Sequence, residues 1–327
     1  MSQALVEAIG LARHYKVPGK RLLRAVDGVD LAIGRGDTLG LVGESGSGKS
    51  TLGRTLVGLQ NPTAGDVLFE QENVAGASGE KLVRLRRQRQ IVFQDPSGAL
   101  NPRMTLGDTI VEHLRVQGAT RAQARARANE VLLRSGLSES FAGRYPHEVS
   151  GGQRQRAVIA RAISTDPAFI VADEPVSALD VSTRAQIMNL LQGLQRRSQL
   201  TMLFISHDLS VVAHMCRNVA VMYLGRVVEQ APRESLFQTP LHPYTAALLS
   251  AIPFPDPVLE RTRTRIVLRG ETPDPSAIPA GCRFHTRCLR ASDICSEVVP
   301  ETRALLPDHT VACHHPLGVE NQIAAGL

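Results

Sequence analysis

The stretch Gly43-Glu44-Ser45-Gly46-Ser47-Gly48-Lys49-Ser50-Thr51 decides the fold of this chain of 327 residues. It matches the pattern G-x-x-x-x-G-K-[ST] in full, between a predicted strand at Asp37 to Val42 and a predicted helix at Lys49 to Leu59. Glycines let backbone N–H groups turn inward around phosphate oxygens, and the helix adds the positive end of its dipole. A glycine-rich turn without a ligand is the alternative, which the strand–helix context argues against. We therefore predict a phosphate-binding loop, with Lys49 on the β- and γ-phosphates and the Ser50 hydroxyl on Mg²⁺.

A second element, Phe169 to Glu174, supports this prediction. Its apolar run is typical of a buried parallel strand, and the run ends in Asp173 and Glu174. Asp173 can hold Mg²⁺ through water, and Glu174 can accept a proton from the attacking water or orient it. Elsewhere such a pair is usually only the start of a loop, but a phosphate-binding loop in the same chain favours catalysis. The predicted reaction is phosphoryl transfer from a Mg²⁺-nucleotide to water.

The rest of the chain alternates between strand and helix patterns. Strands are predicted at Ala4 to Arg13, at Val26 to Ala32 and at Thr201 to Ile205, and a helix at Arg121 to Arg134. This alternation predicts an α/β fold with a largely parallel sheet covered on both faces. Further predicted elements are a helix with Ile187, Leu190, Leu191 and Leu194 on one face, and a hairpin of Val219 to Tyr223 and Arg226 to Glu229. From about Pro232 prolines accumulate, which predicts a separate C-terminal extension rather than another regular layer.

Composition and charge limit the location and the partners. No run approaches the ~20 apolar residues that span a bilayer, and the first ten residues do not resemble a secretory signal. We therefore expect a cytoplasmic protein that meets a membrane only through partners. The net charge of +6 includes arginine clusters that are typical of solvated helix faces. No nucleic-acid-binding module accompanies them. A basic surface close to anionic lipid headgroups is the functional alternative. These arginines are Arg84, Arg86, Arg87, Arg89, Arg121, Arg125 and Arg127.

The segment Val149-Ser150-Gly151-Gly152-Gln153-Arg154-Gln155-Arg156 resembles the signature sequence of ABC transporter ATPases, with valine in place of the usual leucine at its first position. A small glycine-rich turn that opens a helix is a second phosphate cradle. In that family this cradle faces the γ-phosphate of the nucleotide held by the opposite subunit. The resemblance therefore implies that two such subunits enclose two ATP molecules head to tail.

Other elements of that family occur in the expected order. Tyr15 resembles the aromatic residue that stacks on adenine, Gln94 the glutamine that senses γ-phosphate, Mg²⁺ and water, and His207 the switch histidine. Ser177 to Asp180 resembles the loop that communicates across the dimer. Taken alone, Tyr15 or His207 could instead have a purely structural role. The occurrence of all these elements in the family's order favours a role in nucleotide binding and hydrolysis. The implied catalytic residues are Glu174, His207 and Gln94; those for ATP are Tyr15, Gly43, Ser45, Gly46, Ser47, Gly48, Lys49, Ser50, Thr51, Ser150, Gly151, Gly152, Gln153 and Asp180; those for Mg²⁺ are Ser50, Gln94 and Asp173.

Longer stretches resemble the dipeptide and oligopeptide importer branch of the family. The resemblance covers about residues 5 to 316 and is nearest to the second ATPase of a dipeptide importer. It implies a RecA-like P-loop NTPase core with antiparallel β and helical subdomains at 1–235, the helical subdomain at about 96–160, and an importer-type extension at 236–327. The stretches are Phe93-Gln94-Asp95-Pro96, Leu100-Asn101-Pro102-Arg103, Arg144-Tyr145-Pro146-His147, Pro175 to Val181 and His242 to Pro253.

Four of the five cysteines lie in the last 46 residues, at Cys282, Cys288, Cys295 and Cys313. Clustering in a cytoplasmic chain suggests a metal site more than disulfides, and four thiolates can hold either zinc or a [4Fe–4S] cluster. Spacing alone does not choose between them, and nearby histidines could substitute as ligands. The resemblance implies the iron–sulfur cluster, with zinc as the alternative. The fifth, Cys216, is predicted to be a small buried hydrophobic residue.

The resemblance also implies partners and a cycle. We expect a second, non-identical ATPase subunit, two transmembrane permease subunits and a periplasmic or extracellular peptide-binding protein, with this chain at the cytoplasmic face of the inner membrane. ATP binding closes the two ATPases, and Gln94 with residues 97–109 presses on a coupling helix of a membrane subunit. Import of nickel, glutathione or another small solute is the alternative role. An ABC ATPase acting on DNA or ribosomes, and a non-catalytic regulatory half, are two rivals that the single unit and intact Glu174 and His207 argue against.

Overall fold

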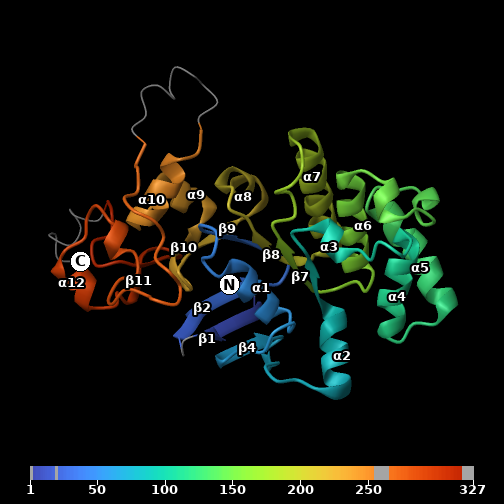
Figure 1. The fold of residues 1–327 in the computed structure, drawn as a ribbon, viewed down its shortest axis with the longest axis horizontal. Coiled ribbons are helices and arrows are strands. Elements are labelled where there is room, and N and C mark those ends of the chain that lie inside the picture. The colour runs from blue at the N-terminus through green and yellow to red at the C-terminus, as the bar shows by residue number, and fades with distance from the viewer. Residues whose placement is uncertain (1–2, 19–20, 254–264, 319–327) are drawn as a thin grey trace.

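The computed structural model describes residues 3–18, 21–253 and 265–318, and it contains two sheets with helices around them (Figure 1). Five parallel strands form one side of the larger sheet, in the spatial order β9, β3, β8, β7, β6, with β6 at the edge. They are β3 (Thr38–Val42), β6 (Arg89–Val92), β7 (Phe169–Asp173), β8 (Thr201–Ile205) and β9 (Asn218–Tyr223). Because helices cover both faces and these strands are almost entirely buried, the α/β prediction is confirmed.

A smaller antiparallel sheet lies beside the parallel one, with helix α1 between the two (Figure 1). Its strands occur in the order β2, β1, β4, β5. Helix α1 (Lys49–Leu56) places Leu52 and Leu56 in a core shared by both sheets. Burial of such side chains contributes roughly 1.5–3 kcal/mol each, so the two sheets stabilise the helix that follows the glycine-rich loop. The strands are β1 (Ala4–Val17), β2 (Arg21–Gly34), β4 (Ala64–Phe69) and β5 (Glu72–Asn73).

A group of helices forms the other end of the molecule (Figure 1). It comprises α3 (Pro96–Ala99), α4 (Leu106–Val116), α5 (Arg121–Arg134) and α6 (Gly151–Ile163), with two 3₁₀ turns at Glu139–Phe141 and Pro146–Glu148. Helix α5 has the bounds that the sequence predicts, because Thr120 and Gln123 form a capping box at its start. The remaining helices of the first 250 residues are α2 (Gly79–Gln88), α7 (Val181–Ser198), α8 (Leu209–Met215), α9 (Arg233–Gln238) and α10 (Pro243–Ser250).

The C-terminal extension differs from the expectation that it adds no regular layer. Its strands β11 (Thr302–Leu306) and β12 (His309–Ala312) join the large sheet, since β12 pairs with β10 (Arg226–Pro232) and β11 with β12, both antiparallel. The extension also contains the short helix α12 (Asp293–Glu297) and a 3₁₀ turn at His285–Arg287. Part of its proline-rich stretch, 254–264, lies outside the described residues.

A buried carboxylate explains why the extension joins the sheet. Glu229 on β10 is fully buried, and its oxygens accept hydrogen bonds from the backbone N–H groups of Leu241 and His242 and from Nε2 of His309. A buried carboxyl group of this kind requires hydrogen-bond partners, and all three of these come from the extension. The sequence offered no sign of this, because a single glutamate in a hairpin strand is ordinarily exposed.

Candidate nucleotide site

Four neighbouring parallel strands bring the predicted site residues to one edge of the large sheet. The glycine-rich loop follows β3, His207 follows β8, Asp173 and Glu174 end β7, and Gln94 follows β6. The strands β3, β8, β7 and β6 are consecutive neighbours. Ligands of open α/β sheets bind at the carboxyl ends of the strands, which is where all of these residues lie.

Two glycines allow the loop to approach its neighbours closely. Gly43 has φ 152° and Gly48 has φ 106°, a range that side-chain-bearing residues rarely adopt. A Cβ on Gly43 would lie 2.1 Å from the carbonyl oxygen of Met222, and one on Gly48 would lie 1.9 Å from that of Ala25. The loop therefore folds tightly only with glycine at both positions.

Lys49 is buried in the loop. Its Nζ donates to the carbonyl oxygens of Gly43 and Glu44, at 2.7 and 2.8 Å, and lies 3.3 Å from the Ser47 hydroxyl. Burial lowers the pKa of Lys49, although Glu174, Asp173 and Glu44 oppose the shift. A buried ammonium whose direct partners are all neutral oxygens suits an anion such as phosphate.

The predicted Mg²⁺ ligands Ser50 and Asp173 are brought together. The Ser50 hydroxyl donates to Oδ1 of Asp173 at 2.8 Å, and Arg54 lies 4.0 Å from the other carboxylate oxygen. Asp173 is only 1% exposed, and burial raises its pKa. A hydroxyl beside a buried carboxylate is the hard oxygen donor set that Mg²⁺ prefers, so these residues fit that ion.

Glu174 lies between the other two predicted catalytic residues. Its Oε2 accepts a hydrogen bond from the Gln94 amide at 3.0 Å and lies 3.1 Å from Nδ1 of His207. Glu174 has φ 46°, an uncommon conformation for a non-glycine residue, and its backbone N–H donates to the carbonyl oxygen of Ile205. The carboxylate is thus oriented from both sides by polar groups.

The predicted signature residues lie apart from this group. Ser150 caps α6 in a capping box with Gln153, and Gly152 lies against Thr183, where an added Cβ would come within 2.4 Å of a methyl group. Asp180 caps α7, and hydrogen bonds from Ser182 and Thr183 lower its pKa. Among the described residues, no hydrogen bond joins Ser150, Gln153 or Asp180 to the glycine-rich loop.

Tyr15 lies on β1, half-buried, outside the large sheet. Its hydroxyl donates to the side-chain oxygen of Gln60 at 2.7 Å, and the guanidinium of Arg13 lies 4.7 Å from its ring centre. These contacts hold the ring in place without covering it completely. The other predicted loop residues, Ser45, Gly46, Ser47 and Thr51, occupy the loop and the first turn of α1.

The cysteine predictions have different outcomes. Cys216 is buried against Val212 and Gly40, as predicted. Burial raises the pKa of Cys282, Cys288 and Cys313. Within residues 3–18, 21–253 and 265–318, no group of three or more His, Cys, Asp or Glu side chains could hold a metal ion. The expectation of zinc or iron–sulfur ligation therefore gains no support from the geometry.

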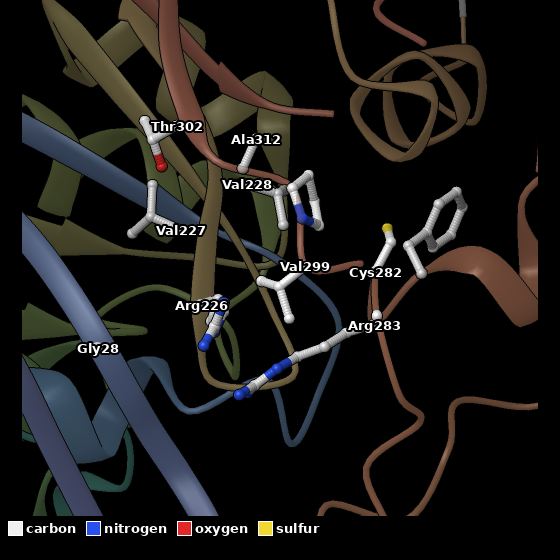
Figure 2. A pocket seen from close by; sticks show the side chains of 12 residues that line it. Gly28, Arg226, Val227, Val228, Cys282, Arg283, Val299, Thr302 and Ala312 are labelled. Atoms are coloured by element: carbon white, nitrogen blue, oxygen red, sulfur yellow. The ribbon is translucent and has the colours of Figure 1, made fainter. Parts of the chain in front are cut away.

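The extension touches the glycine-rich loop and β2, which the sequence did not predict. Arg287 and Thr272 bind the Glu44 carboxylate, and Arg283 binds Asp27 and the carbonyl oxygen of Leu224. Figure 2 shows Arg283 reaching from the extension toward Arg226, beside the strand that carries Gly28; these residues line a cavity of about 70 Å³. An arginine within a cysteine-rich loop carries no sequence signal for such contacts.

Family comparisons agree with the site. The family described as "ABC transporter" matches residues 26–177, and the one described as "Oligopeptide/dipeptide transporter, C-terminal region" matches residues 228–295. A putative peptide import ATP-binding protein of Brucella ovis is 51% identical over 310 residues, which cover 94% of this chain and 97% of the relative. The oligopeptide transport ATP-binding protein AppF of Bacillus subtilis is 52% identical over 294 residues, 89% of each chain.

Solved structures share the fold. A dimeric ATP-binding cassette in a post-hydrolysis state, bound to ADP and phosphate, matches with a TM-score of 0.64 and 31% identity. The match covers 70% of this chain and 98% of that one. Among the described residues, every helix is too short or too polar to span a bilayer.

Proposed function

Because the chain belongs to the ABC transporter ATP-binding subunits and is the ATPase subunit of a peptide importer, we propose that the residues at the carboxyl edge of its large sheet are the site of ATP hydrolysis. The observation that carries this proposal is Glu174, held between Gln94 and His207 and next to the Ser50–Asp173 pair. The arrangement supports the proposal because it groups a candidate base, two polar side chains that contact this base and the candidate Mg²⁺ ligands.

The residues have distinct roles in this proposal. The loop from Gly43 to Thr51 binds the triphosphate, and Lys49 balances its charge. Ser50, Asp173 and Gln94 would hold Mg²⁺, which would supply positive charge to offset that of the phosphates. Glu174 takes the proton of the attacking water, while His207 holds the Glu174 carboxylate in position and is free to reach the γ-phosphate. Tyr15, whose ring is half-buried, stacks on adenine.

The signature residues act on a second subunit. Ser150, Gly151, Gly152 and Gln153 have no hydrogen bond to this chain's own loop among the described residues, and the exposed N-terminus of α6 offers backbone N–H groups to an anion. Asp180, beside them at the start of α7, belongs to the same surface. We infer that this surface completes the site of another, non-identical ATPase subunit, and that the partner's signature completes this one.

A groove lined in part by Gln90 and Ile91 of β6 is a proposed contact with the permease. It lies between α1, α2 and α4 and presents Leu59, Val83 and Val116, which are 48%, 46% and 78% exposed. Exposed apolar side chains in a groove mark an interaction site, and an amphipathic helix of a membrane subunit suits this one. Residues 97–109, which comprise most of α3, the start of α4 and the loop between them, are proposed to press on a coupling helix of the permease together with Gln94.

The cysteine cluster stays a proposal of its own. Charge on any of Cys282, Cys288 and Cys295 further raises the pKa of Cys313, because these thiols lie near one another. This mutual influence of the thiols and the resemblance to the importer branch are what support a [4Fe–4S] cluster, and four thiolates can also hold zinc, which is the alternative. A structural role fits best, since ATP hydrolysis requires no electron transfer.

Peptide import implies permease subunits and a substrate-binding protein as partners. We place the chain at the cytoplasmic face of the inner membrane, attached through the permease. Residues 1–235, with the helical part at about 96–160, are the proposed ATPase unit, and residues 236–327 the extension. A nickel or glutathione importer is the alternative, since the substrate is selected by the other subunits.

Affinity purification of the tagged chain from its own membranes tests the proposal. We expect two membrane subunits and a second ATPase to copurify, and Mg²⁺-dependent hydrolysis that a peptide-loaded binding protein accelerates. Full-rate hydrolysis by the isolated monomer, with no membrane subunit recovered, contradicts it.

A further inference from the structure

Glu44, the second residue of the glycine-rich loop, is held at three points. Its backbone N–H donates to the Tyr244 hydroxyl at 2.8 Å, and its carbonyl oxygen accepts from Lys49 at 2.8 Å. Its carboxylate oxygen Oε2 accepts from Nη1 of Arg287 and from the Thr272 hydroxyl, both at 2.7 Å. Three of these four partners lie 200 or more residues further along the chain. The C-terminal extension therefore grips the loop directly.

The Arg287–Glu44 contact is partly sheltered from water. The side chains of Arg287 and Glu44 are 9% and 26% exposed. Burial by itself would raise the pKa of Glu44, but hydrogen bonds from Arg287 and Thr272 outweigh this and keep it below its usual value. Charge-assisted hydrogen bonds in such a position are stronger than those on an open surface.

A cluster of three buried aromatic rings packs beside the Arg287–Glu44 contact. Phe284, from the extension, packs on Tyr223 at the end of β9 and on Tyr244 of α10, with ring centres 5.2 and 5.3 Å apart. Tyr223 and Tyr244 are themselves 4.7 Å apart, and the three rings are almost completely buried. Since Tyr244 also binds the backbone of Glu44, the cluster positions both the loop and Arg287.

Glu44 poses an electrostatic problem that Arg287 solves. The carboxylate belongs to the loop that is to receive a triphosphate, and it acts on the charge of Lys49. Without Arg287, its negative charge would repel the phosphates and draw Lys49 toward itself. The hydrogen bond from Arg287 offsets the negative charge of the Glu44 carboxylate and fixes its position in the glycine-rich loop.

We propose that Arg287 is a positioning residue for ATP: by pairing with Glu44, it holds the glycine-rich loop in its binding shape and cancels a charge that would weaken nucleotide binding. The C-terminal extension thereby sets the ATP affinity of the subunit. This inference rests on the proposed role of the loop in binding ATP. It predicts an effect on affinity rather than on the chemical step, because Arg287 does not touch Glu174.

The test compares Arg287→Gln, Glu44→Gln and the double variant in the full chain, within the assembled transporter. We expect Arg287→Gln to raise both the Kd and the KM for ATP about tenfold and to change kcat by less than about twofold. Glu44→Gln removes the repelling charge, so the double variant is expected to bind within about threefold of the unaltered protein. Arg287→Lys keeps the positive charge, so its Kd for ATP should lie between those of the unaltered protein and Arg287→Gln.

Controls separate this inference from its alternatives. Arg269→Gln removes an exposed arginine of the same extension and should leave the Kd unchanged. Failure of the unaltered protein to bind ATP contradicts the proposed function. Normal ATP affinity in Arg287→Gln contradicts this inference but leaves the proposed function intact. So does a double variant as weak as Arg287→Gln, because damage to the neighbouring cysteines would not be repaired by a change at Glu44. If Arg287→Gln does not fold, Arg287→Lys and Thr272→Val provide the same comparison.

Discussion

The Nδ1 atom of His207 lies 3.1 Å from Oε2 of Glu174. The Gln94 amide donates a hydrogen bond to the same oxygen, so the Glu174 carboxylate is held in one orientation. A base that is oriented in this way needs no rearrangement of its own before it meets a water molecule. The first prediction follows from this relationship.

Glu174→Gln should keep ATP binding and lose hydrolysis. The amide retains the size and most hydrogen bonds of the side chain but accepts no proton, so the rate should fall by about 10²–10⁴-fold. Nucleotide Kd and phosphate release, both measured in the assembled complex, check this. Glu234→Gln, at an exposed glutamate distant in sequence, is the control. Near-normal turnover would remove Glu174 from the role of base.

Ser150→Arg should stop hydrolysis by the complex although this chain's own loop still binds ATP. The substitution places a large cation at the surface that we assign to the second subunit. It also removes a helix cap, which costs about 1 kcal/mol of stability.

Thr120→Arg controls for the lost cap, because Thr120 closes a capping box on α5 as Ser150 does on α6. Equal loss of hydrolysis in both variants would show that stability, rather than the signature surface, explains the effect.

The cysteine cluster predicts iron and acid-labile sulfide in the anaerobically purified chain. Cys282→Ala should lower both contents, together with the visible absorbance. Cys216→Ala should preserve them, since Cys216 is buried beside Val212 and Gly40 and is not one of the four clustered cysteines. A colourless preparation that contains zinc and no iron would contradict the proposed cluster.

The stability of the fold should fall as the pH falls from about 7 to 5. Burial lowers the pKa of His242 to about 4, so the unfolded chain, whose histidine titrates near 6.5, binds the proton more readily than the folded chain does. The folded state therefore loses roughly 2 kcal/mol across this interval from His242 alone.

His242→Asn should reduce this pH dependence. The Nδ1 atom of His242 accepts from the N–H of Tyr244 and caps α10, and the asparagine oxygen can take over that hydrogen bond without titrating. Urea unfolding at both pH values measures the difference. An unchanged pH dependence in the variant would assign it to other groups.

The sequence predicted the parallel strands and the site residues that follow them, because each local pattern agrees with its neighbours. Phe169 to Ala172 and Thr201 to Ile205 are apolar runs of strand length, and a run of that kind specifies a buried strand. Helix α1 ends at Leu56, before the predicted Leu59, because Gly58 adopts φ 76°. Helix ends are set by such single residues, which a hydrophobic pattern does not register.

The extension could not be predicted in the same way. Its strands β11 and β12 are short and partly exposed, so their pattern is weak. Their place in the sheet depends on the buried carboxylate of Glu229, and the contact of Arg287 with Glu44 joins residues 243 positions apart. Interactions between distant charged side chains leave no periodic trace in the sequence.

The donors that surround Glu229 have a practical consequence for anyone who wishes to shorten this protein. A fragment that stops before Leu241 would remove every donor named above from the Glu229 side chain and leave Tyr223 without its aromatic neighbours Tyr244 and Phe284. Loss of a buried hydrogen-bond network together with aromatic packing costs several kcal/mol, a large share of the total stability of a typical protein. We therefore expect the ATPase unit and the C-terminal extension to unfold together, in one transition, on heating or in urea.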